Sequence, residues 1–279
     1  MPPPPTDPPV DERAPRAAAS RRARHASVTP DYEVKLLLDP AAVLGPDQRL
    51  TGAVRTAFGM PSSATKLNVQ FLDTDGREIY ANGWSPRIRR IEGQSDFELT
   101  YKKRYPITAG DIDAALATAR DDGFDARETG YQAQVEWGYA KQTLSIGRPK
   151  SASGSGFGGT DLPGTRASRS MLADAAPDRF DDWLAIGWGT DALRIARIYG
   201  PVLARRSIGT WAAMPLYIEI WPILDGAGAA TEDVVEASFK TTSRATAGAE
   251  HDGLIAYLQS RGWLRAQDSL KTQLIMDRY

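Results

Sequence analysis

The chain has 279 residues, and its 34 Lys and Arg residues nearly balance its 35 Asp and Glu residues. This length allows one large β-rich domain or two smaller ones with a substantial core, and the balanced charge means that an anion site has to arise by local clustering. The sequence contains no cysteine and two histidines, which excludes disulfides, thiol catalysis and a histidine-rich metal centre. Oxygen ligands remain, and these favour Mg²⁺, Mn²⁺ or Ca²⁺.

The N-terminal segment is rich in Pro, Ala and Arg. We predict that residues 1–29 form a disordered tail, since this composition cannot build a core. The pair Arg21-Arg22 is followed by no apolar stretch, so an export signal is not expected. No apolar run approaches the ~20 residues of a transmembrane helix. We therefore expect a cytoplasmic protein without a membrane partner, folded as a single domain over residues 30–279.

Six β-like segments between residues 31 and 240 place charged or polar side chains at every second position. Successive side chains of a strand point to opposite faces, so each alternating set lies on one face. The sets are Asp31, Glu33 and Lys35; Arg87 and Arg89; Glu98, Thr100 and Lys102; one of Arg205 and Arg206; Tyr217, Glu219 and Trp221; and Glu236, Ser238 and Lys240. If the strands close into a barrel, these faces converge on a charged channel suited to a polyanion and a divalent metal.

The segment around residue 205 is ambiguous because two arginines are adjacent. Val202, Ala204 and Ile208 share the phase of Arg206, and this apolar set predicts that Arg205 is the residue on the charged face. A bulge would reverse that assignment.

The remaining elements follow from periodicity and turn residues. We predict a hairpin from strands 84–91 and 96–104, and a β-like stretch over 131–146 that turns near Gly138. Gln132, Gln134 and Glu136 share one face of that stretch, which either lines the channel or forms a polar outer surface. Further strands are predicted at 32–38, 65–73, 201–210, 216–223 and 234–241; helices at 47–58, 108–122, 249–261 and 266–277; a flexible Gly/Ser loop at 147–165; and a helical insert at 166–196.

A polar strand face has a simpler interpretation, which is a solvated surface. For any single strand that interpretation is preferred, but the recurrence over six strands favours an interior channel. Trp221 shares phase with Glu219 and could stack on a base, although aromatic rings far more often fill a core.

Three motifs resemble those of one known superfamily. Asp31-Tyr-Glu-Val-Lys35 resembles the E-x-E-x-K motif of the CYTH, or triphosphate tunnel metalloenzyme, superfamily. The segment 69–89, which ends in Arg87-Ile-Arg89, is similar to its "Y-F-D-T … L … G-x-x-L-R-I-R" block, and Glu98-Leu-Thr-Tyr-Lys102 is similar to its "L-T-x-K" strand. The resemblance is strongest over residues 31–104, weaker over 201–262, and absent in the tail and the Gly/Ser loop.

The resemblance implies an α+β fold, with a closed barrel of eight antiparallel strands and surrounding helices. Members of the superfamily hydrolyse inorganic triphosphate, thiamine triphosphate or RNA 5′-triphosphate ends, and some cyclise ATP. It thus implies a triphosphate hydrolase that depends on Mg²⁺ or Mn²⁺, with nucleic acid as a partner only through a 5′-triphosphate end. The alternatives are an adenylyl cyclase of the same superfamily, a non-catalytic polyphosphate-binding module, and an unrelated reaction on a diphosphate-bearing metabolite with the insert 166–196 as a lid.

The resemblance also assigns roles to residues of this chain. It implies that Glu33 and Glu236 are catalytic; that Lys35, Arg87, Arg89, Lys102, Arg205, Arg206 and Lys240 bind phosphate; and that Asp31, Glu33, Glu219 and Glu236 bind metal. Two departures motivate the non-catalytic alternative. Asp31 stands where the superfamily has its first glutamate, and Ser238 replaces the second glutamate of its C-terminal E-x-E pair.

Overall fold

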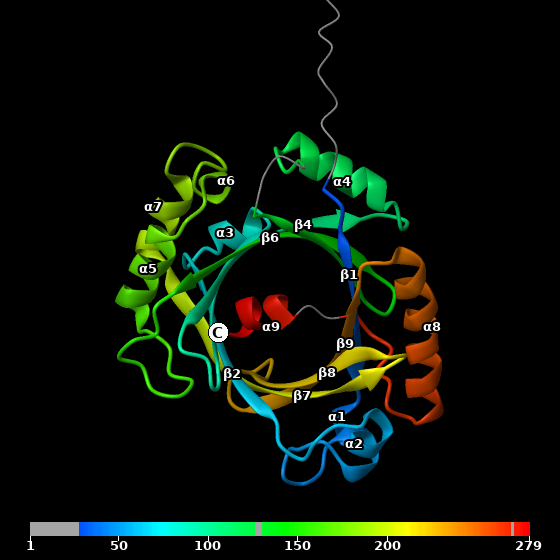
Figure 1. Ribbon diagram of the computed structural model, residues 1–279. Helices are drawn as coiled ribbons and strands as arrows, with labels where there is room; N and C mark the ends of the chain where they lie inside the picture. Colours follow the sequence, from blue (N-terminus) through cyan, green and yellow to red (C-terminus); the bar gives the residue numbers. More distant parts are fainter. Residues whose placement is uncertain (1–27, 126–129, 269–270) are drawn as a thin grey trace, which may run out of the picture.

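Nine strands form a closed barrel in the computed structural model, which describes residues 28–125, 130–268 and 271–279 (Figure 1). The predicted disordered tail, apart from its last two residues, lies outside the described residues. The strands are β1 (Asp31–Leu38), β2 (Thr65–Asp73), β3 (Trp84–Ile91), β4 (Phe97–Ile107), β5 (Gln132–Trp137), β6 (Gln142–Ala152), β7 (Arg197–Trp211), β8 (Met214–Leu224) and β9 (Thr231–Thr241). Their order around the barrel is β1-β5-β6-β4-β3-β2-β7-β8-β9.

The predicted closed barrel with helices around it is confirmed, but its strand count and pairing differ. The stretch predicted over 131–146 divides into β5 and β6, which gives nine strands rather than eight. β1 pairs with β9 in antiparallel orientation and with β5 in parallel orientation, whereas the other neighbours are antiparallel. The barrel is therefore mixed, because its closure joins β1 to a strand that runs in the same direction.

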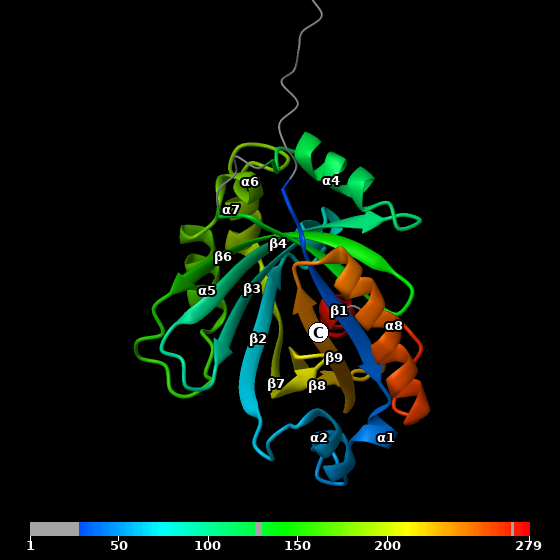
Figure 2. The same cartoon turned by 45° about the vertical axis from the view of Figure 1, so that its right-hand side comes forward.

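Helices cover the outside of the barrel (Figure 2). One helix of the described residues, α9 (Lys271–Arg278), is an exception; the outer helices are α1 (Pro40–Val43), α2 (Gly52–Phe58), α3 (Glu78–Ala81), α4 (Ile112–Asp121), α5 (Thr165–Asp174), α6 (Asp178–Asp181), α7 (Trp188–Ile195) and α8 (Arg244–Ser260). The outer apolar faces of the strands pack under them in one cluster, which includes Val34, Leu99, Phe239 and, from α8, Leu254 and Leu258. This packing leaves the alternate, polar faces directed inward.

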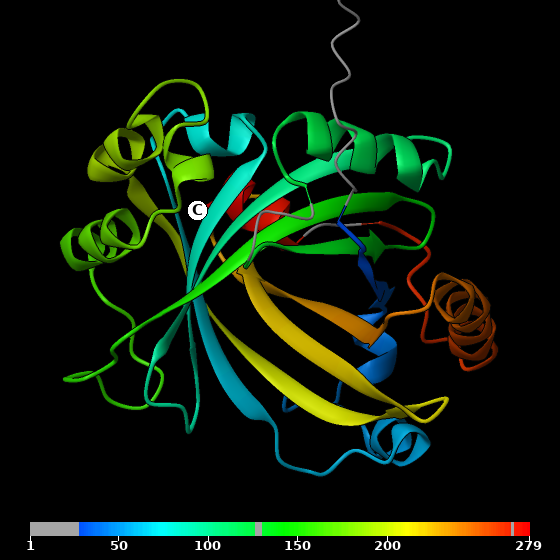
Figure 3. The same ribbon diagram turned by 45° about the horizontal axis from the view of Figure 1, so that its top comes forward.

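The segment between β6 and β7 contains the predicted helical insert, made of α5, α6 and α7 beside the barrel (Figure 3). The preceding loop is shorter than predicted, because β6 continues to Ala152. It is also anchored: Gln70 Nε2 donates to the carbonyl of Pro163 at 3.0 Å, Asn68 Nδ2 donates to that of Thr160 at 3.1 Å, and the ring of Phe157 packs against that of Phe97. These contacts fix the loop to β2 and β4.

The last helix, α9, lies inside the ring of strands, where the sequence had predicted only outer helices (Figure 1). Its Ile275 and Met276 are buried against the inward faces of several strands. The inward apolar residues of this inner cluster are Leu37, Leu67, Val69, Phe71, Tyr199, Val202, Ala204, Trp221, Ile223 and Val234. One part of the barrel interior is thus an apolar core around α9, and the rest is polar.

Polar contacts hold α9 at its C-terminal end as well. Arg77 Nη1 donates to the carbonyl of Met276 at 3.2 Å, and Arg197 Nη2 donates to that of Tyr279 at 2.8 Å. Arg278 Nη1 donates to the carbonyl of Leu224, also at 2.8 Å. The helix is therefore fixed in position by both its apolar face and its end.

Candidate functional site in the barrel lumen

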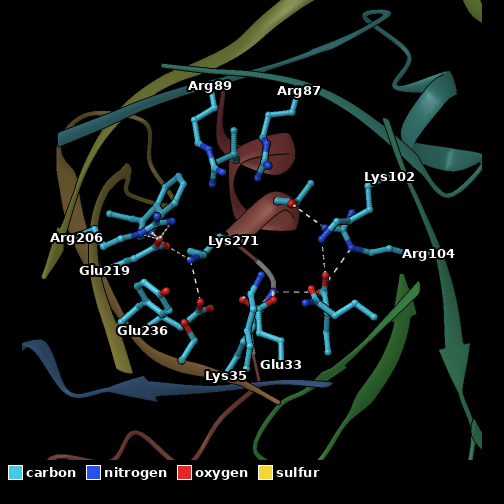
Figure 4. A pocket seen from close by; sticks show the side chains of 18 of the residues that line it. Glu33, Lys35, Arg87, Arg89, Lys102, Arg104, Arg206, Glu219, Glu236 and Lys271 are labelled. Carbon is cyan, nitrogen blue, oxygen red and sulfur yellow. Dashed lines mark hydrogen bonds and ion pairs between the residues drawn. The ribbon is translucent and has the colours of Figure 1, made fainter. Parts of the chain in front are cut away.

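The polar part of the barrel interior encloses a cavity of about 300 Å³ (Figure 4). Its lining carries eight basic side chains and four carboxylates, which leaves an excess of four positive charges. The bases are Lys35, Arg87, Arg89, Lys102, Arg104, Arg206, Lys240 and Lys271, and the carboxylates are Glu33, Glu136, Glu219 and Glu236. A concave lining with an excess of positive charge attracts anions electrostatically.

Strand register brings most of the sequence-predicted residues together. Glu33 of β1 pairs with Lys240 of β9, and Glu219 of β8 pairs with Glu236 of β9. Arg206 of β7 lies opposite Glu219 on its other side. Side chains directly opposite in neighbouring strands are close enough to interact, so the strand register alone brings these charged residues together.

Two predicted site residues lie elsewhere. Asp31 shares the face of Glu33 but is exposed and does not line the cavity. Arg205 does not line it either, whereas Arg206 does. The assignment of Arg205 to the channel was wrong because Val202 and Ala204, taken as outward-facing residues, face inward onto α9, so the residue in phase with them points into the lumen.

Glu136 is the centre of one group of charges. Lys102 Nζ donates to its Oε1 at 2.8 Å, and Lys35 Nζ and Arg104 Nε lie 3.5 and 3.9 Å from its Oε2. The carboxylate is 3% exposed. Burial would raise its pKa, but the three cations hold the pKa well below its usual range, so Glu136 is ionised. Lys35 also lies 2.9 Å from Glu33, which connects this group to β1.

Glu219 and Glu236 form a second group around a lysine from α9. Lys271 Nζ donates to Glu219 Oε2 at 2.6 Å and to Glu236 Oε1 at 2.9 Å. Arg206 Nε donates to Glu219 Oε1 at 2.8 Å, and Trp221 Nε1 donates to Oε2 at 2.9 Å. Lys271 and Arg206 hold the pKa of Glu219 well below normal against the effect of burial, whereas burial raises the pKa of Glu236. The two carboxylates are thus electrostatically unequal.

Arg87 and Arg89 of β3 face these groups across the lumen (Figure 4). Arg89 is paired with Glu98. Arg87 Nη2 donates to Thr100 Oγ1 at 3.2 Å, and its buried Nε has no hydrogen-bond partner among the described residues. Burial and the neighbouring Arg89 lower the pKa of Arg87, yet a guanidinium stays protonated at neutral pH. Arg87 therefore contributes to the lumen lining a positive charge that forms no ion pair with a carboxylate of the described residues.

The predicted metal set does not assemble in this arrangement. Across residues 28–125, 130–268 and 271–279, no group of three or more His, Asp or Glu side chains could hold a metal ion. The closest approximation is the pair Glu219 and Glu236, and the ammonium of Lys271 already binds both of them. With Lys271 in this position, Glu219 and Glu236 do not form a site in which the protein alone could hold a metal ion.

Sequence reasoning missed or left open several lining residues. Arg104 continues the alternation of Glu98, Thr100 and Lys102 within the predicted strand 96–104, so following the alternation to the end of that strand would have found it. Glu136 had been placed either in the channel or on the surface, and the structure places it in the channel. Lys271 lies on a helix, where strand alternation gives no signal.

The fold and the lining together define a charged-tunnel barrel protein. No family model matches the sequence, and no curated protein matches it. Among solved structures, an adenylyl cyclase candidate from Hippeastrum with a dominant triphosphatase activity has 14% identity and a TM-score of 0.54, and the alignment covers 88% of this chain and 94% of that one. An adenylate cyclase candidate from Bacillus halodurans has 12% identity and a TM-score of 0.50, with 88% and 96% covered.

The chain therefore has the CYTH-like tunnel fold, and the resemblance stated from its motifs is confirmed at the level of the fold. None of the helices in the described residues is both long and apolar enough to span a membrane.

Proposed function

We propose that this protein binds a triphosphate in the barrel lumen and hydrolyses it. The excess of four positive charges in an enclosed cavity carries the proposal. A triphosphate has about four negative charges at neutral pH, so it would neutralise the lining. The fold likeness to a protein with dominant triphosphatase activity supports the same substrate class.

In the proposed complex, the bases on the open side of the lumen hold the phosphate oxygens. Arg87 and Arg89 are suited to bidentate contacts, and Lys102, Arg206 and Lys240 add positive charge. In the hydrolytic step a water oxygen bonds to the terminal phosphorus, the bridging P–O bond breaks, and the water proton passes to a carboxylate. The basic residues stabilise the charge that develops on the equatorial oxygens.

Glu33 and Glu236 are the proposed proton acceptors. Burial raises the pKa of Glu236, which makes it a stronger base than an ordinary carboxylate. Glu33 lies in the lumen between Lys35 and Lys240; burial would raise its pKa, but these two lysines lower it, so Glu33 is ionised and able to accept a proton, although it is the weaker base of the two. The predicted Mg²⁺ or Mn²⁺ remains a proposal. Because Lys271 holds the carboxylate pair, we propose that the cation arrives bound to the triphosphate oxygens.

A panel of triphosphates, each assayed with Mg²⁺, Mn²⁺ and EDTA, tests this function. We expect phosphate release by the wild-type protein and its loss, by at least about 100-fold, in Glu33→Gln, because the amide cannot accept the proton. Micromolar binding of triphosphate without turnover under any of these conditions would instead establish the non-catalytic module.

The alternative function, adenylyl cyclase, is suggested by the proteins with a similar fold. Its product distinguishes it from a triphosphate hydrolase. ATP with Mn²⁺ would give cyclic AMP and pyrophosphate rather than phosphate. Trp221, the aromatic candidate for contact with adenine, has Lys271 Nζ at 4.6 Å from its ring centre, so a cation already lies over this ring. We therefore propose hydrolysis over cyclisation.

Binding of triphosphate should weaken as the pH rises through 8. Burial lowers the pKa of Lys102 to about 8, although Glu136 beside it acts in the opposite direction. The ammonium is therefore protonated below pH 8 and loses its charge above it, so affinity should fall by up to about tenfold between pH 8 and 9. Calorimetric titration with inorganic triphosphate at pH 7, 8 and 9 measures this, and Lys102→Arg, whose charge persists, should show a flatter profile. Equal profiles for the two proteins would contradict the assignment.

A further inference from the structure

The most informative contact outside the proposed chemistry is the one that Lys271 makes with the two carboxylates. Its ammonium lies 2.6 Å from Glu219 and 2.9 Å from Glu236, which are directly opposite each other on β8 and β9. Figure 4 shows Lys271 projecting between them. The ammonium occupies the place where paired carboxylates would hold a hard divalent cation.

The position of Lys271 is set by the helix that carries it. Ile275, one turn further along α9, is fully buried in the inner cluster, and Thr272 accepts a hydrogen bond from Arg104 Nη2 at 3.3 Å. Trp221 lies beside the ammonium and donates to the same Glu219. Because the helix is anchored, the lysine is held at the carboxylates and its side chain is 16% exposed.

We propose that Lys271 is a built-in cation that fills a latent divalent-metal site between Glu219 and Glu236. Mg²⁺ or Mn²⁺ then binds these two carboxylates only when the ammonium is absent or displaced. The observation behind this proposal is that two buried carboxylates lie directly opposite each other and share one ammonium as their counterion.

Electrostatics makes the two cations mutually exclusive. A divalent ion bound to a carboxylate oxygen lies about 2.0–2.2 Å from it, so it would need the same oxygens that Lys271 contacts. An ammonium left a few ångströms from such an ion would repel it strongly in this buried environment. Removing the ammonium has the opposite effect, because it leaves two buried carboxylates without their shared counterion.

Binding of Mn²⁺ alone, followed by calorimetry and by the loss of the free-ion electron paramagnetic resonance signal, tests the proposal. We expect Lys271→Ala to bind one Mn²⁺ at least about tenfold more tightly than the wild-type protein. Mn²⁺ should also raise the unfolding temperature of Lys271→Ala and leave that of the wild type nearly unchanged. The double variant Lys271→Ala/Glu236→Gln should lose the gained affinity, since one ligand is missing.

Arg205→Ala is the control. It removes one positive charge from the same barrel, but Arg205 does not line the cavity, so its Mn²⁺ affinity should stay within about twofold of wild type. If Lys271→Ala does not fold without metal, Lys271→Gln retains length and a hydrogen-bond donor and should show the same change to a smaller extent.

Two results would overturn the proposal. One is a wild-type protein that already binds Mn²⁺ as tightly as Lys271→Ala and loses it on Glu236→Gln. The other is a folded Lys271→Ala or Lys271→Gln protein with no gain in affinity. The experiment contains no triphosphate, so its outcome is independent of whether the proposed hydrolysis is correct.

Discussion

Replacing Arg87 by alanine should weaken the binding of inorganic triphosphate by about 10- to 100-fold. A hydrogen bond between charged groups contributes about 1.5–3 kcal/mol, and each 1.4 kcal/mol corresponds to a tenfold change in affinity. Arg87 meets the conditions for this effect because it lines the cavity, donates to the neutral hydroxyl of Thr100 and, within the described residues, forms no ion pair with a carboxylate. Calorimetric titration with triphosphate in the presence of EDTA, and again with Mg²⁺, measures the change.

Arg205→Ala is the matched control for that experiment. Arg205 belongs to the same barrel and carries the same charge, but it does not line the cavity. Its replacement should change triphosphate affinity by no more than about twofold, as expected for a screened surface charge. A similar loss in the two variants would mean that Arg87 acts only through the overall charge of the barrel, and not through contact with the anion.

The alternation of charged residues was sufficient to predict the lumen. Glu33, Lys35, Arg87 and Arg89 occupy alternate positions in strands whose other faces are mostly apolar, so only one orientation buries the apolar side chains. Once the barrel closes, the same rule places all of these charges inside. Most of the candidate lining follows from this one pattern, whereas the closed barrel itself was implied by the motif resemblance.

The rule failed where the inside of the barrel is apolar. Val202 and Ala204 face inward because α9 lies there, and Arg206 follows them into the lumen. A pattern of alternation separates two faces of a strand but does not state which face is inside. For β7, that decision depends on Ile275 and Met276, about 70 residues further along the chain.

Lys271 could not be found from the sequence for a related reason. An eight-residue helix with a basic residue at its start is typical of an exposed terminal helix, and its position inside the barrel is a tertiary property. The same holds for Glu136. The sequence did not distinguish whether its side chain faces the channel or the outer surface; the pairing of β5 with β1, which sets Glu136 opposite Glu33, decides this. The placement of both charged residues in the lumen is thus determined by tertiary packing and not by a local sequence pattern.

Glu136→Gln should lower the free energy of unfolding by about 3–5 kcal/mol, which is the usual cost of removing one partner from a buried ionic group. Glu136 is 3% exposed and is the shared carboxylate of Lys35, Lys102 and Arg104, so the neutral amide leaves three half-buried cations undercompensated. Urea-induced unfolding near neutral pH, where Glu136 is ionised, measures the loss.

The same substitution should strengthen triphosphate binding at acidic pH, where the bases keep their protons and the positive excess of the lumen rises by one charge. The gain should shrink towards pH 8, because Glu136 no longer raises the pKa of Lys102. Added triphosphate should restore part of the lost stability. Glu98→Gln is the control. Glu98 also pairs with a tunnel arginine, Arg89, but its side chain is 36% exposed, so we expect a loss of at most about 1 kcal/mol. Equal losses for the two variants, or a Glu136→Gln protein that triphosphate does not stabilise, would contradict the role of Glu136 as the buried counterion of the anion-binding bases.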